Sequence, residues 1–217
     1  METGLELLKV VITAGAAFAG VWYGQRNSNR KDVERAHLEA EKRQQEKVFV
    51  ATVVVKHLEA YINACVAAAH DDGTESGYPA GGNGIYRTTT PRPEFDPYKL
   101  DVNLQALPSA LIYDVLSIPM RQDAAEDYLA SPGSFDPPYD EYIWERGHQF
   151  AKLGQYAIEV ATRLRRSTGL PKEDLSQGWR SREEALAAVV TQYEENLAAR
   201  ARQFPNIGSA LPPHSGT

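Results

Sequence analysis

Residues 48–69 read VFVATVVVKHLEAYINACVAAA, an apolar stretch with a few polar interruptions. The three valines at 53–55 would suit a β-strand, because β-branched residues favour strands. The polar residues, however, recur at steps of four, three and four, at Thr52, Lys56, Glu59 and Asn63. Such spacing places them in one stripe along a helix whose other sides are apolar. We therefore predict the central helix of an all-α bundle, and not a membrane span, because charged residues lie at its centre.

The residues before this helix predict a solvated helical stalk. Residues 31–47 are charged nearly all round, and oppositely charged residues stand four apart along them. The pairs are Arg35–Glu39, Glu39–Arg43 and Lys42–Glu46. Pairs at this spacing meet on one face of a helix and stabilise it in water. Val33 and Leu38 are too few to form a buried face, so we assign residues 26–47 to a basic collar followed by a charged stalk.

Closer to the N-terminus, residues 5–24 read LELLKVVITAGAAFAGVWYG and predict a single transmembrane helix. Twenty helical residues span about 30 Å, the thickness of the hydrocarbon core of a bilayer. Aromatic residues end the segment and basic residues follow it, as is typical of a membrane interface. We assign residues 1–25 to this anchor, with the lipid bilayer as its partner. The expected interfacial residues are Trp22, Tyr23, Arg26, Arg30 and Lys31.

The basic residues also predict how the anchor is oriented. By the positive-inside rule, the short N-terminus lies outside the cell membrane and the rest of the chain lies in the cytoplasm. Two other interpretations stay open. A cleaved signal peptide would use Ala17-Phe18-Ala19, although the basic residues follow the apolar run instead of preceding it. A core helix of a soluble protein would explain why the uncharged run is short and rich in Ala and Gly.

Within the anchor, Ala16, Gly20 and Gly24 recur every four residues and make one side of the helix nearly flat. Small residues at this spacing let two membrane helices approach closely. They are also common in any membrane helix. The sequence thus contains a candidate packing face for a homodimer.

Residues 71–105 interrupt the helical pattern with five glycines and four prolines. A loop of this length is usually functional or disordered, and it is where a specific surface is most expected. The run Gly81–Gly84 is not a phosphate-binding loop, because no Lys-Ser or Lys-Thr follows it and no strand precedes it. Apolar residues predict that the loop packs against the bundle. They are Tyr78, Ile85, Tyr86, Phe95, Tyr98 and Leu100.

Two helices are expected after the loop. The first extends from Leu107 to Leu129, and Pro119 should break or kink it. The second begins after Asp136, whose side chain can cap the helix ahead of a Pro-Pro pair, and it ends near Ser167, before Gly169. With the helix of residues 48–69 and a last one described next, these make a bundle of about four helices.

The last helix begins with a capping box, Ser181 and Glu184, and should end at Pro205. Its apolar residues recur at a spacing that resembles a coiled coil. We assign residues 48–204 to the bundle domain, including the loop at 71–105. Residues 205–217 are rich in Pro, Gly and Ser and predict a disordered tail.

Two Glu-x-x-His pairs are candidate metal ligands, Glu34 with His37 and Glu145 with His148. In di-metal helical bundles such pairs face one another in the core. The first pair lies in the charged stalk. On a helical wheel His148 falls opposite the apolar face of its helix, so we expect both pairs to be solvated and predict no metal site.

Other chemistry-bearing residues give weak signals. Cys65 lies among apolar residues and is expected to be a buried, inert thiol. No Gly-x-Ser-x-Gly nucleophile motif is present. Tyr139, Tyr142 and Trp144 stand beside acidic residues at the start of a helix, where they would either bind a partner or pack at the rim of the core.

The charge distribution limits the classes of function. The net charge is −6, which argues against nucleic-acid binding, since proteins that bind nucleic acid usually present a basic face. Residues 26–31 carry three basic residues and no acid, whereas residues 32–217 carry 19 basic and 27 acidic residues. The basic collar would favour anionic headgroups, and the acidic body would be repelled from them.

We expect a membrane-tethered, non-enzymatic interaction or accessory protein that presents a cytoplasmic bundle to an unknown protein partner. No motif specifies a reaction, so no catalytic residue and no cofactor is predicted. The first alternative is a bundle that binds a small ligand or a metal and has enzymatic activity. The second is an exported helical protein with a cleaved signal peptide.

Overall fold

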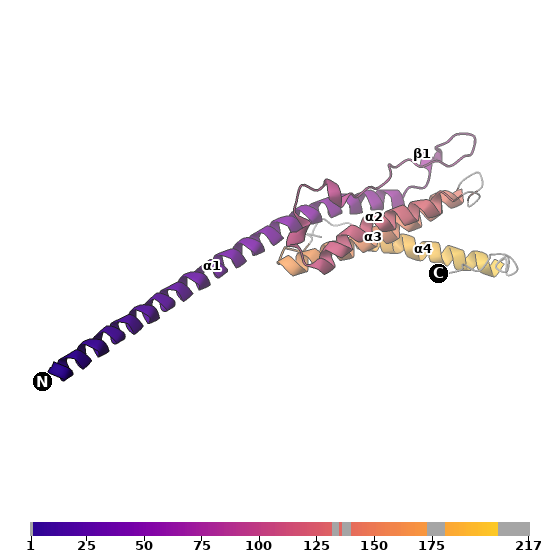
Figure 1. Ribbon diagram of the computed structural model, residues 1–217. Helices are drawn as coiled ribbons and strands as arrows, with labels where there is room; N and C mark the ends of the chain where they lie inside the picture. Colours follow the sequence, from indigo (N-terminus) through magenta and orange to yellow (C-terminus); the bar gives the residue numbers. More distant parts are fainter. Residues whose placement is uncertain (1, 132–134, 136–139, 173–180, 204–217) are drawn as a thin grey trace. The chain divides into compact units, whose positions relative to one another are not determined.

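The structure is a computed structural model that describes residues 2–131, 135, 140–172 and 181–203, with side chains from residue 31 onward. Within these ranges the chain forms four α-helices and a long loop after the first helix, and this loop contains one short hairpin and two 3₁₀ turns (Figure 1). The four α-helices confirm the predicted all-α class. The chain divides into two compact units, Met1–Lys47 and Val48–Thr217, here named unit 1 and unit 2.

The elements follow one another along the chain in a simple order. The helices are α1 (Glu2–Ala69), α2 (Ser109–Leu129), α3 (Asp140–Thr168) and α4 (Arg182–Gln203). Two-residue strands β1 (Thr74–Glu75) and β2 (Tyr78–Pro79) pair antiparallel after α1. Two 3₁₀ turns, Pro97–Lys99 and Leu104–Ala106, lead into α2.

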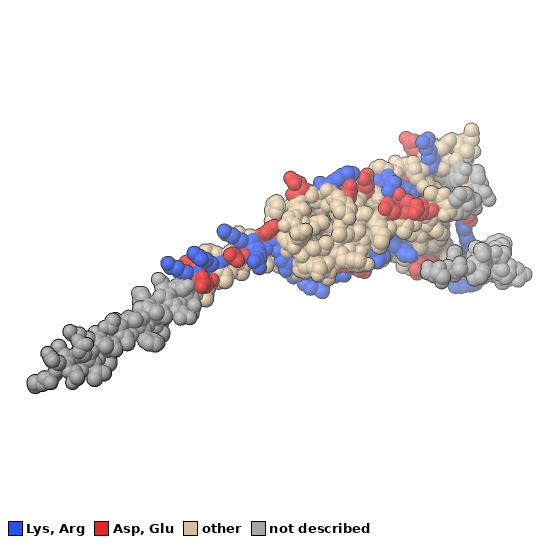
Figure 2. Space-filling model, viewed as in Figure 1, with Lys and Arg blue, Asp and Glu red and all other residues tan. Residues whose placement is uncertain are grey.

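Unit 1 is a continuous stretch of α1. Every side chain from residue 31 to residue 46 is exposed, and Figure 2 shows basic and acidic side chains intermixed along this stretch. His37 and Glu41 form an ion pair at 3.4 Å, and Arg43 and Glu39 form one at 3.8 Å. In each pair the two residues are four positions apart, about one helical turn. The exposure of Glu34 and His37 agrees with the expectation that this pair is solvated.

In unit 2, α1 is the central helix that the polar spacing predicts. Its valines at 53–55 are helical, and its apolar side packs into the core through residues such as Val54, Leu58 and Ile62. Among the residues with described side chains, one helical segment, Lys31–Ala69, is long and apolar enough to cross a membrane. Of its most apolar stretch 44% is buried inside the protein. The predicted anchor at residues 5–24 has a helical backbone.

The predicted break at Pro119 is wrong, because α2 continues through this residue. A proline in a helix interior removes one backbone donor, here the one that would bond the carbonyl of Val115. Val115 and Ile118 before the proline and Gln122 after it are all buried. Burial of both halves against the same core offsets the cost of the missing hydrogen bond.

The predicted end of α3 at Gly169 and the predicted capping box at the start of α4 are both confirmed. Gly169 adopts a φ of +72° directly after α3, the left-handed conformation that ends helices. Ser181 and Glu184 form the capping box reciprocally, with each backbone N–H donating to the other side chain over 3.1 Å. The predicted cap at Asp136, the end at Pro205 and the tail at 205–217 lie outside the described residues.

The loop packs on the bundle in part. Phe95 and Leu100 are buried as predicted, and the ring of Phe95 lies 5.9 Å from that of Tyr61 on α1. Tyr78, Ile85 and Tyr98 are exposed instead, Tyr78 by 76% and Tyr98 by 82%. Tyr78 lies on the short hairpin, and Tyr98 lies in a turn that the Asp96 side chain caps, so local backbone bonds set where these rings point.

Candidate functional site

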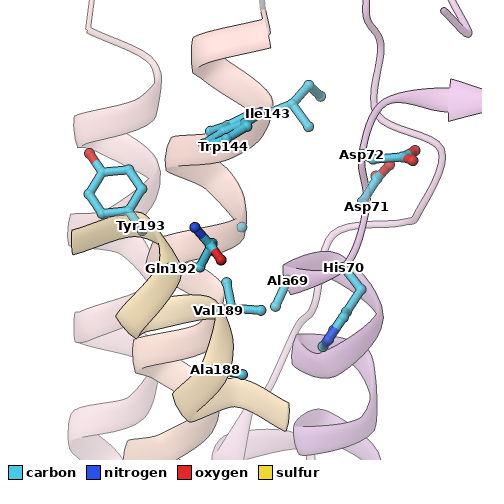
Figure 3. A pocket seen from close by; sticks show the side chains of 11 residues that line it. Ala69, His70, Asp71, Asp72, Ile143, Trp144, Ala188, Val189, Gln192 and Tyr193 are labelled. Atoms are coloured by element: carbon cyan, nitrogen blue, oxygen red, sulfur yellow. The ribbon is translucent and has the colours of Figure 1, made fainter. Parts of the chain in front are cut away.

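A pocket of about 360 Å³ lies in unit 2 where the end of α1 meets α3 and α4 (Figure 3). Its wall is largely apolar, and its polar groups come from the residues that follow α1 and from α4. The lining residues are Ala69, His70, Asp71, Asp72, Ile143, Trp144, Gly147, Ala188, Val189, Gln192 and Tyr193.

Small residues make the pocket. At Gly147 of α3, a Cβ atom would come within 3.0 Å of the carbonyl oxygen of Ala69, so glycine lets α3 approach the end of α1 closely. Across from them α4 contributes Ala188 and Val189, and Val189 faces Ala69 in Figure 3. Trp144 lies at the opening and is 50% exposed. The result is an apolar hollow with an aromatic side chain at its edge.

A polar cluster between α3 and α4 adjoins the pocket. The Glu145 carboxylate accepts hydrogen bonds from the Tyr193 hydroxyl and, over 2.8 Å, from Gln149 Nε2. The His148 ring stacks on the Tyr193 ring with centroids 3.9 Å apart, and its Nδ1 lies 3.5 Å from Glu145 Oε1. Burial alone raises the pKa of Glu145, but its contacts with His148, Tyr193 and Gln149 outweigh burial and lower it to about 2.

This cluster corrects the expectation that Glu145 and His148 are solvated. Both are buried, Glu145 with 6% and His148 with 9% exposure. On a helical wheel His148 falls opposite the main apolar face of α3, which led to the expectation of a solvated side chain. However, α4 covers the remaining side of α3, and Tyr193 of α4 lies on the His148 ring.

A second buried group, Asp71 and Arg146, fixes the wall of the pocket. Asp71 accepts hydrogen bonds from the backbone and hydroxyl groups of Thr89 and Thr90 and from Arg146 Nη1 over 3.1 Å. Arg146 also donates to the carbonyl oxygens of Thr90 and Pro91. Burial raises the pKa of Asp71, but hydrogen bonds from Thr90, Thr89 and Gly73 prevail and lower it to about 2. The pair ties the loop to α3.

Sequence reasoning missed this pair. Neither Asp71 nor Arg146 belongs to any of the sequence motifs described above. The two partners are 75 residues apart in the sequence, so no local spacing reveals the contact. The available signal is the position of Arg146 three residues after Ile143 and four before Phe150, which places it on the apolar face of α3.

Two further candidate residues, Cys65 and His70, lie in α1 and directly after it, respectively. Cys65 is buried as predicted, and burial raises the pKa of its thiol to about 12. His70 is exposed at the end of α1, with Nδ1 2.9 Å from the Val66 carbonyl oxygen. In the described part of the chain, no three His, Cys, Asp or Glu side chains are grouped so that they could hold a metal ion.

The residues predicted from the other patterns lie in different places. Of the aromatic cluster, Tyr139 lies outside the described residues, Tyr142 contacts Phe135, and Trp144 lines the pocket. The predicted membrane residues lie on helical backbone of unit 1, and of these the side chain of Lys31 is described and is exposed. The others are Ala16, Gly20, Trp22, Tyr23, Gly24, Arg26 and Arg30.

The two buried carboxylates at and beside the pocket act as hydrogen-bond acceptors. Glu145 and Asp71 are ionised at neutral pH and already accept several hydrogen bonds each, so neither is suited to transfer a proton. The apolar wall and the half-exposed Trp144 instead offer contact area to an apolar group. No protein-family model, curated protein or solved structure matches this chain.

Proposed function

We propose that this chain is a membrane-tethered, non-enzymatic interaction protein whose bundle binds a protein partner in the cytoplasm through the pocket between α1, α3 and α4. The observation that carries the proposal is the open apolar pocket with Trp144 at its edge. Interfaces concentrate their binding energy in aromatic side chains beside desolvated pockets of this kind.

The shape and charge of the pocket describe the partner. A hollow of about 360 Å³ accepts one or two apolar side chains, such as those of Leu or Phe. Asp72 is exposed at the rim, and residues 48–217 carry 22 acidic and 15 basic residues. The partner is therefore a protein segment that places an apolar side chain between basic residues, because the basic residues would complement the acidic surface.

The sequence of unit 1 supports the proposal that the protein is anchored in a membrane. The uncharged run, its aromatic end and the basic residues that follow it support a membrane anchor at residues 5–24. The helical backbone from Glu2 onward is compatible with it. Basic residues on the C-terminal side of the anchor support a cytoplasmic bundle.

Site-specific crosslinking tests the binding site. A photoreactive phenylalanine analogue replaces Trp144 in the full-length protein in its native membrane, and in a matched control it replaces the exposed Tyr98 of the loop. We expect a discrete protein crosslink from position 144 and none from position 98. Val189→Glu should abolish the crosslink, because it places a charge in the pocket. Equal crosslinking from both positions, or crosslinking that survives Val189→Glu, would refute the site.

Two measurements test the tether. A reporter enzyme that is active only outside the cytoplasm is fused after Thr217, and we expect it to be silent. Intact mass after expression with the native N-terminus should include residues 1–19. Reporter activity would reverse the orientation, and loss of residues up to Ala19 would support the exported alternative with a cleaved signal peptide.

One observation favours a second candidate function, binding of a small apolar ligand. The pocket volume of about 360 Å³ lies within the range of small-molecule pockets. Native mass spectrometry of the full-length protein released from detergent micelles distinguishes the two. A bound small molecule that disappears in the Val189→Glu variant would favour the ligand, whereas an unliganded mass together with the crosslink at position 144 favours the protein partner.

A further inference from the structure

A second cavity in unit 2 differs from the first in its charge. It measures about 460 Å³ and lies between the C-terminal end of α3 and the N-terminal end of α4. Four basic side chains line it, from Arg165, Arg166, Lys172 and Arg182. Glu183 is the one acidic side chain among the lining residues that the structure describes. This concentration of positive charge stands out in a protein of net charge −6.

Two of the four cations are held in place by neighbours. Arg165 is nearly buried and forms an ion pair with Glu59 of α1. Arg182 donates to Asn63 Oδ1 over 2.8 Å and to the Glu59 carbonyl oxygen over 3.4 Å. Burial lowers the pKa of Arg182, the negative charge of Glu59 opposes this, and the positive charge of Arg165 lowers the pKa again, so the two guanidinium groups repel each other. Glu59 also pairs with Lys56 at 2.9 Å, so its carboxylate forms ion pairs with two cations.

The other two cations have no partner among the described residues. Arg166 and Lys172 are exposed at the cavity, and neither forms a hydrogen bond or ion pair with any residue that the structure describes. The Ser181 hydroxyl oxygen accepts the Glu184 N–H, which leaves the hydroxyl hydrogen to donate. An anion in the cavity would meet all of these groups, together with the positive end of the α4 dipole.

We propose that this cavity binds a phosphate group carried by an organic molecule. A phosphate offers several acceptor oxygens to guanidinium, ammonium and hydroxyl donors, and arginine matches its geometry in a bidentate manner. The cavity is larger than a bare anion requires, and Ile158 and Leu170 provide apolar wall for the organic part. The phosphate comes either from a soluble phosphate ester or from a lipid headgroup, which share this chemistry.

Binding there links α3 to α4. Arg166 and Lys172 belong to the end of α3 and the residues after it, and Ser181 and Arg182 belong to the start of α4. A bound phosphate would relieve the repulsion between the cations on the two sides. A ligand that binds the folded state in this way raises the thermal midpoint of unfolding.

Binding is measured on the full-length protein in nanodiscs, by calorimetry and by the thermal midpoint at constant ionic strength. One arm uses zwitterionic lipid with added inorganic phosphate or glycerol 3-phosphate, and chloride serves as the reference ion. A second arm uses nanodiscs with phosphatidylglycerol and no soluble phosphate. The double variant Arg166→Ala/Lys172→Ala removes the two cations that have no partner in the described part of the chain. The control Arg87→Ala/Lys152→Ala removes two exposed cations elsewhere in unit 2.

We expect phosphate or its ester to bind and to raise the midpoint in the first arm, and the Arg166/Lys172 variant to weaken binding at least about tenfold while the control changes little. A rise confined to phosphatidylglycerol nanodiscs that is lost in the same variant assigns the phosphate to a lipid headgroup. Absence of a response in both arms, or equal losses in the two double variants, would overturn the proposal.

Discussion

Asp71 shows how much one buried carboxylate can organise. It accepts hydrogen bonds from two threonines of the loop and from Arg146 of α3, and its side chain is completely buried. The same contacts hold the loop against the helix that forms the pocket. A buried ion pair adds little net stability compared with apolar residues, but removal of one partner leaves the other charge uncompensated.

Asp71→Ala should therefore destabilise the protein by about 3 to 5 kcal/mol, because Arg146 is left as an unpaired buried cation. The matched control is Asp72→Ala, which removes the neighbouring, exposed carboxylate and should cost about 1 kcal/mol or less. Urea unfolding of the full-length protein in micelles, followed by circular dichroism, measures both. Similar losses in the two variants would contradict the role given to Asp71.

The lowered pKa values of Asp71 and Glu145 predict that the folded protein loses stability at acidic pH. The pKa of Asp71 is about 2 in the fold against an ordinary 3.8, and that of Glu145 is about 2 against 4.5. A carboxyl with a lower pKa when folded stabilises the protein above its unfolded pKa and loses this contribution as the pH falls to the folded value. We expect a loss on the order of 2 kcal/mol per group between pH 4.5 and about 2.

Thermal midpoints measured across this pH range test the assignment. The double variant Asp71→Asn/Glu145→Gln should unfold at a lower temperature at neutral pH and show a flatter dependence on pH between 4.5 and 2. An unchanged slope would mean that other carboxyls cause the acid sensitivity.

At the scale of elements, α4 is the helix with the weakest apolar attachment. Among its described side chains Leu186 alone is buried, and it packs against Ala69 and Ala151. Gly154 of α3 makes room for it, since a Cβ there would lie 2.7 Å from Leu186 Cδ1. The partly buried Val189 and Val190 also pack there, and polar contacts add to the attachment, from Tyr193 to Glu145 and from Arg200 to Glu141.

Leu186→Ala should release α4 before the rest of unit 2 unfolds. Truncation of a buried leucine costs about 2 to 5 kcal/mol, and here few other apolar contacts hold the helix. Hydrogen exchange should show a loss of protection in the amides of α4 while those of α2 stay protected. Leu197→Ala, at an exposed position of α4, is the control and should change little. Simultaneous loss in α2 and α4 would show that α4 is an integral part of the core.

Short sequence motifs predicted the caps and ends of helices correctly, but they did not predict contacts between residues far apart in the sequence. The Ser181–Glu184 box and the end at Gly169 depend on residues within a few positions, so spacing alone revealed them. Burial of His148 depends on a helix that begins more than thirty residues later, and the Asp71–Arg146 pair spans 75 residues. The pocket itself forms where Gly147 of α3 lies close to Ala69 of α1. The residue spacing within either helix does not predict this contact between two helices.

At the scale of the whole molecule, charge is distributed unevenly along the chain. Residues 26–31 carry three positive charges, whereas residues 48–217 carry seven more acidic than basic residues. In the proposed arrangement the collar is attracted to anionic lipid, and each basic residue near the surface contributes about 1 kcal/mol. The acidic bundles of two neighbouring copies repel each other, and salt screens that repulsion.

Self-association through the anchor would therefore depend on both the small-residue face and salt. Gly20→Ile/Gly24→Ile should weaken association of the full-length protein in vesicles, measured by energy transfer between labelled copies, because two bulky side chains hold the backbones apart. Ala14→Ile adds bulk on another side of the same helix and is the control. Higher salt should strengthen association of the unmodified protein, since it screens the acidic bundles. An energy-transfer signal that is unchanged by the double variant would show that the face formed by Ala16, Gly20 and Gly24 reflects composition and not a dimer.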